Sequence, residues 1–267
     1  MPEAPELEII KRELKEQVVG RQIIDIRTGP PALFSPNPKL IKEYLQGKIV
    51  EDIERYGKFL IFSFDNTYNI GIHFGVGGSL LYREKDKERG YVFFVALDDG
   101  KALFFKDLEY GKILLFENEG LYKDLGPDIM DKDLFTEEYL TKVVKGKNKY
   151  IKLLLMDQKL ISGLGNTYTD EILYRAKIHP KRKAKTLEQK EISNLYYYID
   201  NVIREAISLG GNSEDGFLDI YGNKGMVQDK LIIVHHRMGR ACPLCGAKIE
   251  KIKLGGRDTY FCPICQI

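Results

Sequence analysis

The sequence predicts an α+β protein: an N-terminal antiparallel β-sandwich with a packed helix, then a C-terminal helical domain with a helix–turn–helix and a zinc β-hairpin. Three observations predict this arrangement. Apolar runs separated by turns fill the first half of the chain. The apolar period becomes helical after Gly126-Pro127-Asp128, and all four cysteines lie in the last 26 residues. We expect domains at 1–128, 129–234 and 235–267.

The first half of the chain begins with a predicted helix over residues 5–19, with Pro5 in its first turn and Gly20 at its end. Its apolar residues recur at helical spacing: Leu7, Ile10, Leu14 and Val18. From Ile23 to about Glu117, aromatic and aliphatic runs predict strands. These strands are 58–64, 91–97, 101–105 and 112–116, with turns at Asp65-Asn66 and Asp98-Asp99-Gly100.

The second half of the chain returns to helical spacing. Helices are expected near 136–144, 149–157, 166–176, 188–208 and 227–233. Between the last two, residues 210–225 are rich in glycine and polar turn formers, which predicts a mobile loop.

The size and charge of the chain exclude few functions. A chain of 267 residues suits two domains, or one large domain with an appendage. No apolar run is long enough to cross a bilayer and no apolar signal segment precedes the charged start, so we expect a cytoplasmic protein. Residues 1–130 carry 18 Lys+Arg and 22 Asp+Glu (−4), and residues 131–267 carry 23 and 17 (+6), giving the net +2. Phosphate contact is therefore favoured in the second half.

The four cysteines form two C-x-x-C pairs, Cys242/Cys245 and Cys262/Cys265, separated by sixteen residues. This is the spacing of a tetrahedral Cys₄ zinc site. Two disulfides would require an exported chain, and redox motifs would require a βαβ context. Between the pairs, an alternating segment turns at Gly255-Gly256, which predicts a β-hairpin held by the metal. Such a basic hairpin either contacts nucleic acid or pins the chain end.

The start of the chain offers a reactive amine. Removal of Met1 would leave Pro2 with a free secondary amine, whose pKa of about 8 lies well below the pKa of about 10.4 of a lysine. A secondary amine and a sugar aldehyde form an iminium that serves as an electron sink, and Glu3 could supply the proton. From these residues alone, an ordinary exposed chain start explains Pro2-Glu3 as well.

A second candidate is the segment 152–175, which predicts a helix, a tight turn with Gly163 and Gly165, and a second helix. Asn166 is expected to cap that second helix, where free N–H groups and the helix dipole attract phosphate. A connection between two core helices would explain the same pattern.

Together these motifs resemble the formamidopyrimidine-DNA glycosylase and endonuclease VIII family of base-excision repair enzymes. The likeness covers nearly the whole chain. It is carried by Pro2-Glu-Ala-Pro-Glu6, Tyr56-Gly-Lys-Phe-Leu60, His73-Phe-Gly-Val-Gly-Gly-Ser-Leu80, Met156-Asp-Gln158, Gly163-Leu-Gly-Asn-Thr-Tyr-Thr-Asp-Glu171, Ile178-His-Pro180 and Gly255-Gly-Arg257.

The resemblance implies a bifunctional DNA glycosylase and abasic-site lyase that acts as a monomer on damaged double-stranded DNA, at the nucleoid of a prokaryote-like cell. Pro2 would attack C1′ of a flipped-out nucleoside, and Glu3 would open the sugar. Lys58 would contact phosphate and assist β-elimination, and Arg257 would hold phosphate and promote δ-elimination. The DNA contacts implied are Glu6, His73, Tyr110, Asn166 and Arg257. The segment 152–175 would be a helix–two-turn–helix, and the cysteines would hold one structural Zn²⁺.

Ordinary explanations exist for several of these residues. Lys58 could be one more exposed strand lysine, Arg257 a solvated turn residue, and Glu6 an acid placed for the helix dipole. The basic run Lys181-Arg-Lys183 is expected to be a solvated face.

The chain departs from the family pattern where the purine-directed branch contacts the duplex. Val76 stands where that branch has methionine. Asp107-Leu-Glu-Tyr110-Gly111 replaces Asp-Pro-Arg-Arg-Phe-Gly, so the arginine that faces the partner base is missing, although Tyr110 could still wedge into the stack. The 212–225 loop also differs from the longer lesion-capping loop. Oxidised pyrimidines, ring-opened purines, 8-oxoguanine and abasic sites therefore all stay open as substrates.

A competing hypothesis is a non-catalytic, zinc-containing DNA-binding protein on the same scaffold. Pro2-Glu3 and Lys58 argue against it, because binding alone needs no reactive amine.

Overall fold

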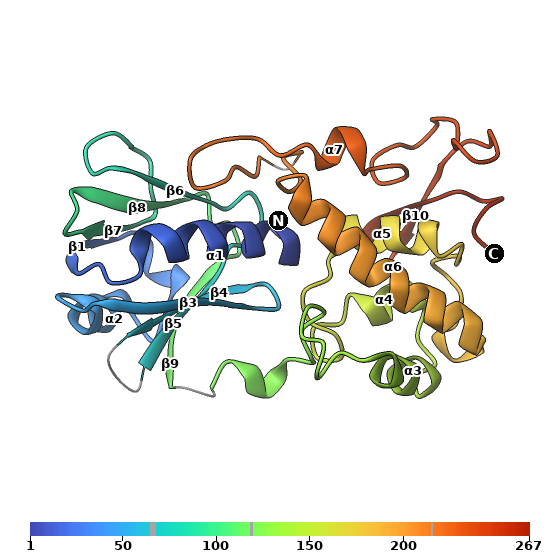
Figure 1. The fold of residues 1–267 in the computed structure, drawn as a ribbon, viewed down its shortest axis with the longest axis horizontal. Coiled ribbons are helices and arrows are strands. Elements are labelled where there is room, and N and C mark those ends of the chain that lie inside the picture. The colour runs from blue at the N-terminus through green and yellow to red at the C-terminus, as the bar shows by residue number, and fades with distance from the viewer. Residues whose placement is uncertain (65–67, 118–119, 215) are drawn as a thin grey trace. The chain divides into compact units, whose positions relative to one another are not determined.

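In the computed structural model, which describes residues 1–64, 68–117, 120–214 and 216–267, the chain forms two compact units (Figure 1). The first contains Met1–Lys123 with Ile207–Gln228, and the second contains Asp124–Ala206 with Asp229–Ile267. The turn expected at Asp65-Asn66 lies outside the described residues.

The first unit is the predicted β-sandwich. One sheet has the order β1(Ile23–Thr28), β7(Phe93–Leu97), β8(Lys101–Lys106), β6(Ser79–Glu84). The other has the order β2(Phe34–Ser35), β9(Lys112–Glu117), β5(Tyr68–His73), β4(Phe59–Phe64), β3(Val50–Tyr56). Neighbouring strands are antiparallel, except that the short β2 runs parallel to β9. The expected strand segments are thus confirmed, with β7 beginning two residues later than expected.

Apolar side chains from both sheets and from the first helix form the sandwich core. Phe93 of β7 packs against Phe34 and Phe105, with ring centroids 5.5 and 5.2 Å apart. Leu7 and Leu14 of the helix are fully buried in the same cluster. Each side chain of this size contributes about 1.5–3 kcal/mol when it leaves water, so this cluster is what holds the helix on the sheets.

The first helix is α1(Ala4–Val18), within one residue of the predicted bounds. It begins after Glu3, which has an extended backbone, and Val19 ends it by returning to β geometry. A second helix, α2(Pro38–Leu45), was not expected within the strand region. Asn37 starts it by accepting a hydrogen bond from the Leu40 N–H at 2.9 Å.

The segment 207–228, which includes the expected loop, packs with the sandwich. Phe217 and Ile220 are buried in its core. The Ile220 carbonyl accepts hydrogen bonds from the Tyr82 N–H and from Arg83 Nη1, at 2.9 and 3.0 Å. Glu13 Oε2 of α1 accepts the Ile220 N–H at 3.1 Å. Segment 207–228 is therefore anchored to β6 and α1.

The second unit is helical. Its elements are α3(Glu137–Lys145), α4(Ile151–Leu155), α5(Asn166–Arg175), η3(Ala184–Thr186), α6(Gln189–Ser208) and α7(Val227–Lys230), η3 being a short 3₁₀ turn. Two further 3₁₀ turns are η1(Pro31–Leu33) in the first unit and η2(Tyr122–Asp124), where the chain passes from the first unit to the second. The last residues of α6 and the start of α7 belong to the first unit. Two helices are shorter than expected: α4 begins only at Ile151, since Tyr150 pairs with Lys183 in a β-bridge, and α7 ends at Lys230.

The predicted hairpin is confirmed as β10(Glu250–Leu254) and β11(Arg257–Phe261). Gly255 and Gly256 form its two-residue turn with φ of +58° and +78°, a conformation that favours glycine at both positions. Among the helices of the described ranges, none has the length and apolarity that a bilayer span requires.

Candidate active site and metal centre

The predicted reactive start of the chain is buried in the first unit. Pro2 is buried, Glu3 is only 3% exposed and Glu6 only 2%. The Glu3 N–H donates to Glu6 Oε2 at 2.9 Å, and the other carboxylate oxygen of Glu6 accepts the Asn212 N–H at 2.9 Å. Glu6 therefore joins the chain start to the 207–228 segment, a positioning role that goes beyond the helix dipole. Gly211 lies against Glu6: a Cβ there would come within 3.2 Å of its Cγ.

Lys58 occupies a rigid turn rather than the strand. Gly57 and Lys58 join β3 to β4, and Gly57 has a φ of +56° at the first turn position. Arg55 Nη1 donates to the Gly57 carbonyl at 3.0 Å, and Arg55 Nε contacts Glu8 Oε2 at 3.3 Å. Because the Arg55 and Glu8 side chains are 4% and 5% exposed, α1 is tied to the Lys58 turn through a buried ion pair. Lys58 itself is 7% exposed, which excludes the explanation of an ordinary surface lysine.

Glu8 stays ionised in this buried setting. Burial disfavours the charged carboxylate, but hydrogen bonds and charges from Lys11, Arg12 and Arg55 outweigh it and hold the Glu8 pKa below its ordinary value.

His73 lies at the end of β5, within the electrostatic range of Lys58. Burial, together with the smaller effect of the Lys58 charge, lowers the His73 pKa to about 4. Its Nδ1 accepts the Gly75 N–H at 3.3 Å, so in the neutral ring the proton is on Nε2. His73 is thus a neutral donor beside a cationic lysine, which suits contact with an anionic oxygen.

Two loops of the first unit, residues 74–78 and 107–111, are joined to each other; we call them the paired loops. The Val76 N–H donates to the Glu109 carbonyl at 2.7 Å. A Cβ at Gly75 would lie 2.0 Å from the same carbonyl, so only glycine fits there. Val76 is 51% and Tyr110 81% exposed, and Tyr110 holds a φ of +57° that non-glycine residues seldom adopt. The paired loops therefore present an apolar tip to solvent.

In the second unit, the segment between α4 and α5 makes two turns closed by one side chain. Gln158 Nε2 donates to the Met156 and Leu164 carbonyls at 3.0 and 2.8 Å, and its Oε1 accepts the Gly163 N–H at 3.0 Å. The expected helix–turn–helix is present, and Gln158 sets the path of its connection.

The expected capping role of Asn166 is wrong. Gly165 is the N-cap of α5, and Asn166 is the first helical residue. Its Nδ2 instead donates to the Asp258 carbonyl of β11 at 3.0 Å. The start of α5 is thus fixed to the hairpin, directly beside Arg257.

A buried polar network completes this junction between helices and hairpin. Lys152 and Asp170 are essentially inaccessible and form an ion pair at 2.7 Å. Asp170 Oδ2 also contacts His235 Nδ1 at 2.8 Å and accepts the Tyr260 N–H at 3.2 Å. Neighbouring Glu171 accepts three consecutive backbone N–H groups, from Ile233, Val234 and His235. Sequence reasoning missed this network, although a charged Lys152 inside an apolar run was its visible signal.

Arg257 is exposed at the hairpin tip. A Cβ at Gly255 would lie 2.6 Å from Leu153 Cδ2, so the tip packs against α4. The hairpin tip that carries Arg257 is therefore packed against α4, while the Arg257 side chain remains accessible.

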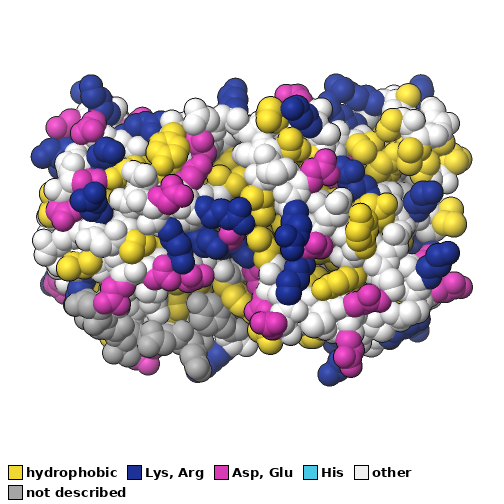
Figure 2. All heavy atoms as spheres, viewed as in Figure 1, with side chains coloured by type: hydrophobic (Ala, Val, Ile, Leu, Met, Phe, Trp, Pro, Cys, Tyr) yellow, Lys and Arg dark blue, Asp and Glu magenta, His cyan; other side chains and the backbone are white. Residues whose placement is uncertain are grey.

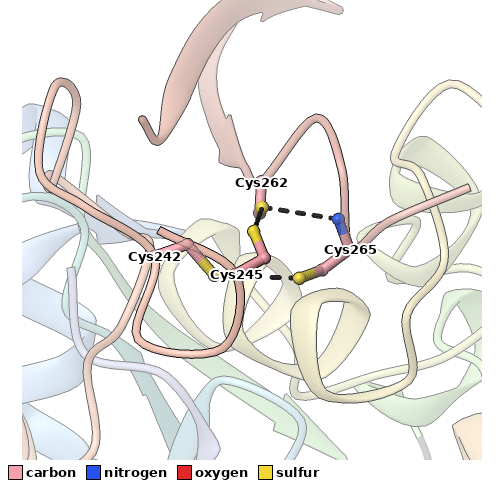
Figure 3. A group of neighbouring side chains, drawn as sticks. All are labelled: Cys242, Cys245, Cys262 and Cys265. Atoms are coloured by element: carbon pink, nitrogen blue, oxygen red, sulfur yellow. Dashed lines mark hydrogen bonds between the residues drawn. The ribbon is translucent and has the colours of Figure 1, made fainter. Parts of the chain in front are cut away.

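The four cysteines converge as predicted (Figure 3). Their sulfur atoms all lie within 4.8 Å of one another. Cys242 and Cys265 are 3.8 Å apart and Cys245 and Cys262 are 3.5 Å apart, close to the edge of about 3.8 Å of a tetrahedron with Zn–S bonds of about 2.3 Å. These separations are too long for disulfides. The Tyr174 hydroxyl of α5 lies 3.3 Å from Cys242 Sγ, which links the metal centre to the helix.

The candidate residues thus form two sets. Pro2, Glu3, Glu6, Lys58, His73 and Tyr110 lie in the first unit, and Asn166, Arg257 and the cysteines lie in the second. On the face shown in Figure 2, Lys and Arg side chains lie among Asp and Glu side chains.

Family models match the chain in three consecutive parts. Residues 1–112 match the formamidopyrimidine-DNA glycosylase N-terminal domain, 125–216 the formamidopyrimidine-DNA glycosylase H2TH domain, and 239–267 a zinc finger found in this enzyme and in IleRS. The zinc-finger match and the four converging sulfurs together define one structural zinc site.

Whole-chain relatives agree. The chain is 38% identical to the formamidopyrimidine-DNA glycosylase of Bacillus cereus, covering all of this chain and 99% of the relative. It resembles a Lactococcus lactis variant of the enzyme bound to Fapy-dG-containing DNA (TM-score 0.91, 33% identity, 99% of each chain). A wild-type Lactococcus lactis complex with DNA containing an oxidised pyrimidine gives a TM-score of 0.89 at 33% identity, again over 99% of each chain. The chain belongs to the formamidopyrimidine-DNA glycosylase family, which confirms the resemblance stated from the sequence.

Proposed function

We propose that this protein is a DNA glycosylase of base-excision repair that removes oxidised bases from double-stranded DNA and then cleaves the strand as an abasic-site lyase. The observation that carries the proposal is the buried chain start, where Pro2 follows a removable methionine and precedes the buried Glu3, whose N–H donates to the buried Glu6. Family membership supports the glycosylase step, and the chemistry of Pro2 supports the lyase step.

In the proposed reaction, the Pro2 nitrogen attacks C1′ and the bond from C1′ to the damaged base breaks, so the base departs with its electron pair and a proton. Glu3, as an acid, gives a proton to the ring oxygen O4′, which opens the sugar and leaves an iminium between Pro2 and C1′. Loss of a C2′ proton then expels the 3′ phosphate. Loss of a C4′ proton expels the 5′ phosphate, and water releases the remaining aldehyde from Pro2.

This chemistry requires the removal of Met1. With Met1 in place, the Pro2 nitrogen is an amide and cannot act as a nucleophile. We therefore propose that the mature form begins at Pro2, which intact-protein mass spectrometry would test.

The remaining candidates would hold the DNA backbone. Lys58 and neutral His73 would bind phosphate oxygens of the damaged strand, with Lys58 also assisting β-elimination. In the second unit, the first N–H groups of α5 around Asn166 would bind phosphate, and Arg257 would hold phosphate during δ-elimination.

Borohydride trapping tests the proposal. Incubation of the processed protein with an abasic duplex and borohydride should reduce the iminium to a stable adduct, seen as a shifted band on a denaturing gel. Glu3→Gln should lower the yield strongly, and Pro2→Gly should lose most of it, since glycine provides a less persistent imine. Asp124→Asn, which removes a carboxylate outside the described site, serves as the control. Binding of abasic DNA without any adduct would instead favour the non-catalytic alternative.

A further inference from the structure

Base extrusion leaves a gap in the stack beside the partner base, and proteins that flip bases commonly fill such gaps with apolar side chains. The paired loops carry exposed apolar side chains of this kind near the proposed phosphate contacts. A Cβ at Gly111 would lie 2.8 Å from the His73 carbonyl, so the 107–111 loop packs directly on the end of β5. Because Tyr110 and Val76 form the exposed tip, they would enter the duplex at the level of the lesion.

Glu109 immediately precedes Tyr110, and its side chain is exposed. Its backbone is fixed, since its N–H donates to the Asp107 carbonyl at 2.8 Å and its carbonyl accepts the Val76 N–H. Within the described ranges, its carboxylate makes no hydrogen bond or ion pair. A carboxylate at the tip of a DNA-inserting loop is repelled by phosphates, unless it meets hydrogen-bond donors on a base.

We propose that Glu109 recognises the base left unpaired opposite the lesion and favours guanine, which makes oxidised cytosine the preferred substrate class. This inference rests on the proposed function. An ionised carboxylate only accepts hydrogen bonds. The pairing edge of guanine presents two adjacent donors, N1–H and N2–H, that match the two oxygens. Adenine and cytosine offer one amino group beside an acceptor, and thymine offers one N–H between two carbonyls.

The test measures binding rather than turnover. Four duplexes carry the abasic analogue tetrahydrofuran opposite guanine, adenine, cytosine or thymine, and fluorescence anisotropy gives Kd for each. The guanine duplex should bind about five- to fiftyfold more tightly than the others, as expected for a bidentate contact. Glu109→Gln should bring the four Kd values together, because the amide places a donor against one of the two guanine donors.

Asp107→Asn is the matched control, because it removes one negative charge from the same loop. It should tighten binding to all four duplexes by a similar factor, and the guanine duplex should still have the lowest Kd. Equal Kd values for the wild type, or an unchanged order in Glu109→Gln, would overturn the inference. A guanine preference that disappears in Glu109→Gln would support the role of Glu109 even if borohydride trapping failed. The binding test and the trapping test can therefore give opposite results, and each proposal can be rejected without the other.

Discussion

The protonation state of His73 is set by the residues around it. Burial and the Lys58 charge lower its pKa from 6.5 to about 4, so the ring is neutral near pH 7 and donates from Nε2. The unfolded chain binds this proton below about pH 6.5 and the folded chain only near pH 4. The contribution of His73 to stability is therefore complete above pH 6.5 and is lost as the pH falls toward 4.

We predict that the His73 Cε1–H resonance titrates with a midpoint near pH 4 in the folded protein. Lys58→Met should raise that midpoint, since it removes the charge that opposes protonation. NMR of the histidine region from pH 3.5 to 8 would measure both. A midpoint near 6.5 in the wild type would contradict the described burial of the ring.

Lys58 gives a second prediction at this scale. Lys58→Gln should weaken binding of abasic-analogue DNA and reduce the slope of log Kd against log salt by about one phosphate contact. Lys42→Gln, an exposed α2 lysine with the same charge change, should leave the slope nearly unchanged. Anisotropy titrations at several salt concentrations would separate the two, and equal slopes would remove Lys58 from the interface.

The sequence predicts some of the candidate site residues correctly and others not. The chain start, Lys58 and the cysteines could be selected because motif spacing defines them. The metal site at the cysteines is confirmed, and the catalytic roles of Pro2, Glu3 and Lys58 stay predictions. The cap at Asn166 could not be foreseen correctly, because its amide is taken by the Asp258 carbonyl, 92 residues further along the chain. Contacts of that separation leave no local periodic signal.

Among the elements, α1 depends on one buried ion pair for its attachment to the Lys58 turn. In Arg55→Met, Lys11 and Arg12 would still compensate Glu8, so the loss is that of a hydrogen bond to a charged group, about 1.5–3 kcal/mol. We predict that Arg55→Met lowers the free energy of unfolding by about this amount. Glu8→Met with Arg55→Met should recover much of the loss, because no charge then remains buried.

Urea unfolding of the wild type, the single variant and the double variant would measure this coupling. The Glu8 pKa is depressed, so its stabilising contribution is present above pH 4.5 and is lost as the pH falls through the folded-state value. The effect of Arg55→Met should accordingly shrink in acid. A double variant less stable than Arg55→Met would show that packing, not charge, governs this site.

Element types were more accessible to sequence reasoning than element ends. Strong aliphatic and aromatic runs marked β4, β8 and β9, and Gly255-Gly256 marked the hairpin turn. The helix α2 was missed because eight residues contain few helical repeats, although Asn37-Pro38 provides a start signal. The segment 210–225 appeared loop-like because its turns dominate, whereas its two buried apolar residues, Phe217 and Ile220, set its packing.

At the scale of the whole molecule, removal of the metal should impair DNA binding by the second unit and leave the first unit folded. We predict that Cys262→Ser loses zinc and weakens DNA binding at least tenfold, because the hairpin that carries Arg257 loses its base. The sandwich has its own core and should remain folded. Zinc analysis, anisotropy and near-UV circular dichroism would report the three effects, and undiminished DNA binding would exclude a role for the hairpin.

The path of the backbone has a practical consequence. The chain passes from the first unit to the second after Lys123, returns at Ile207 and leaves again after Gln228. A fragment that stops at residue 123 would lack Phe217 and Ile220, exposing part of the sandwich interior to water. Dissecting this enzyme by truncation should therefore yield insoluble material, whereas a cut between residues 123 and 124 in the intact polypeptide should leave its pieces associated.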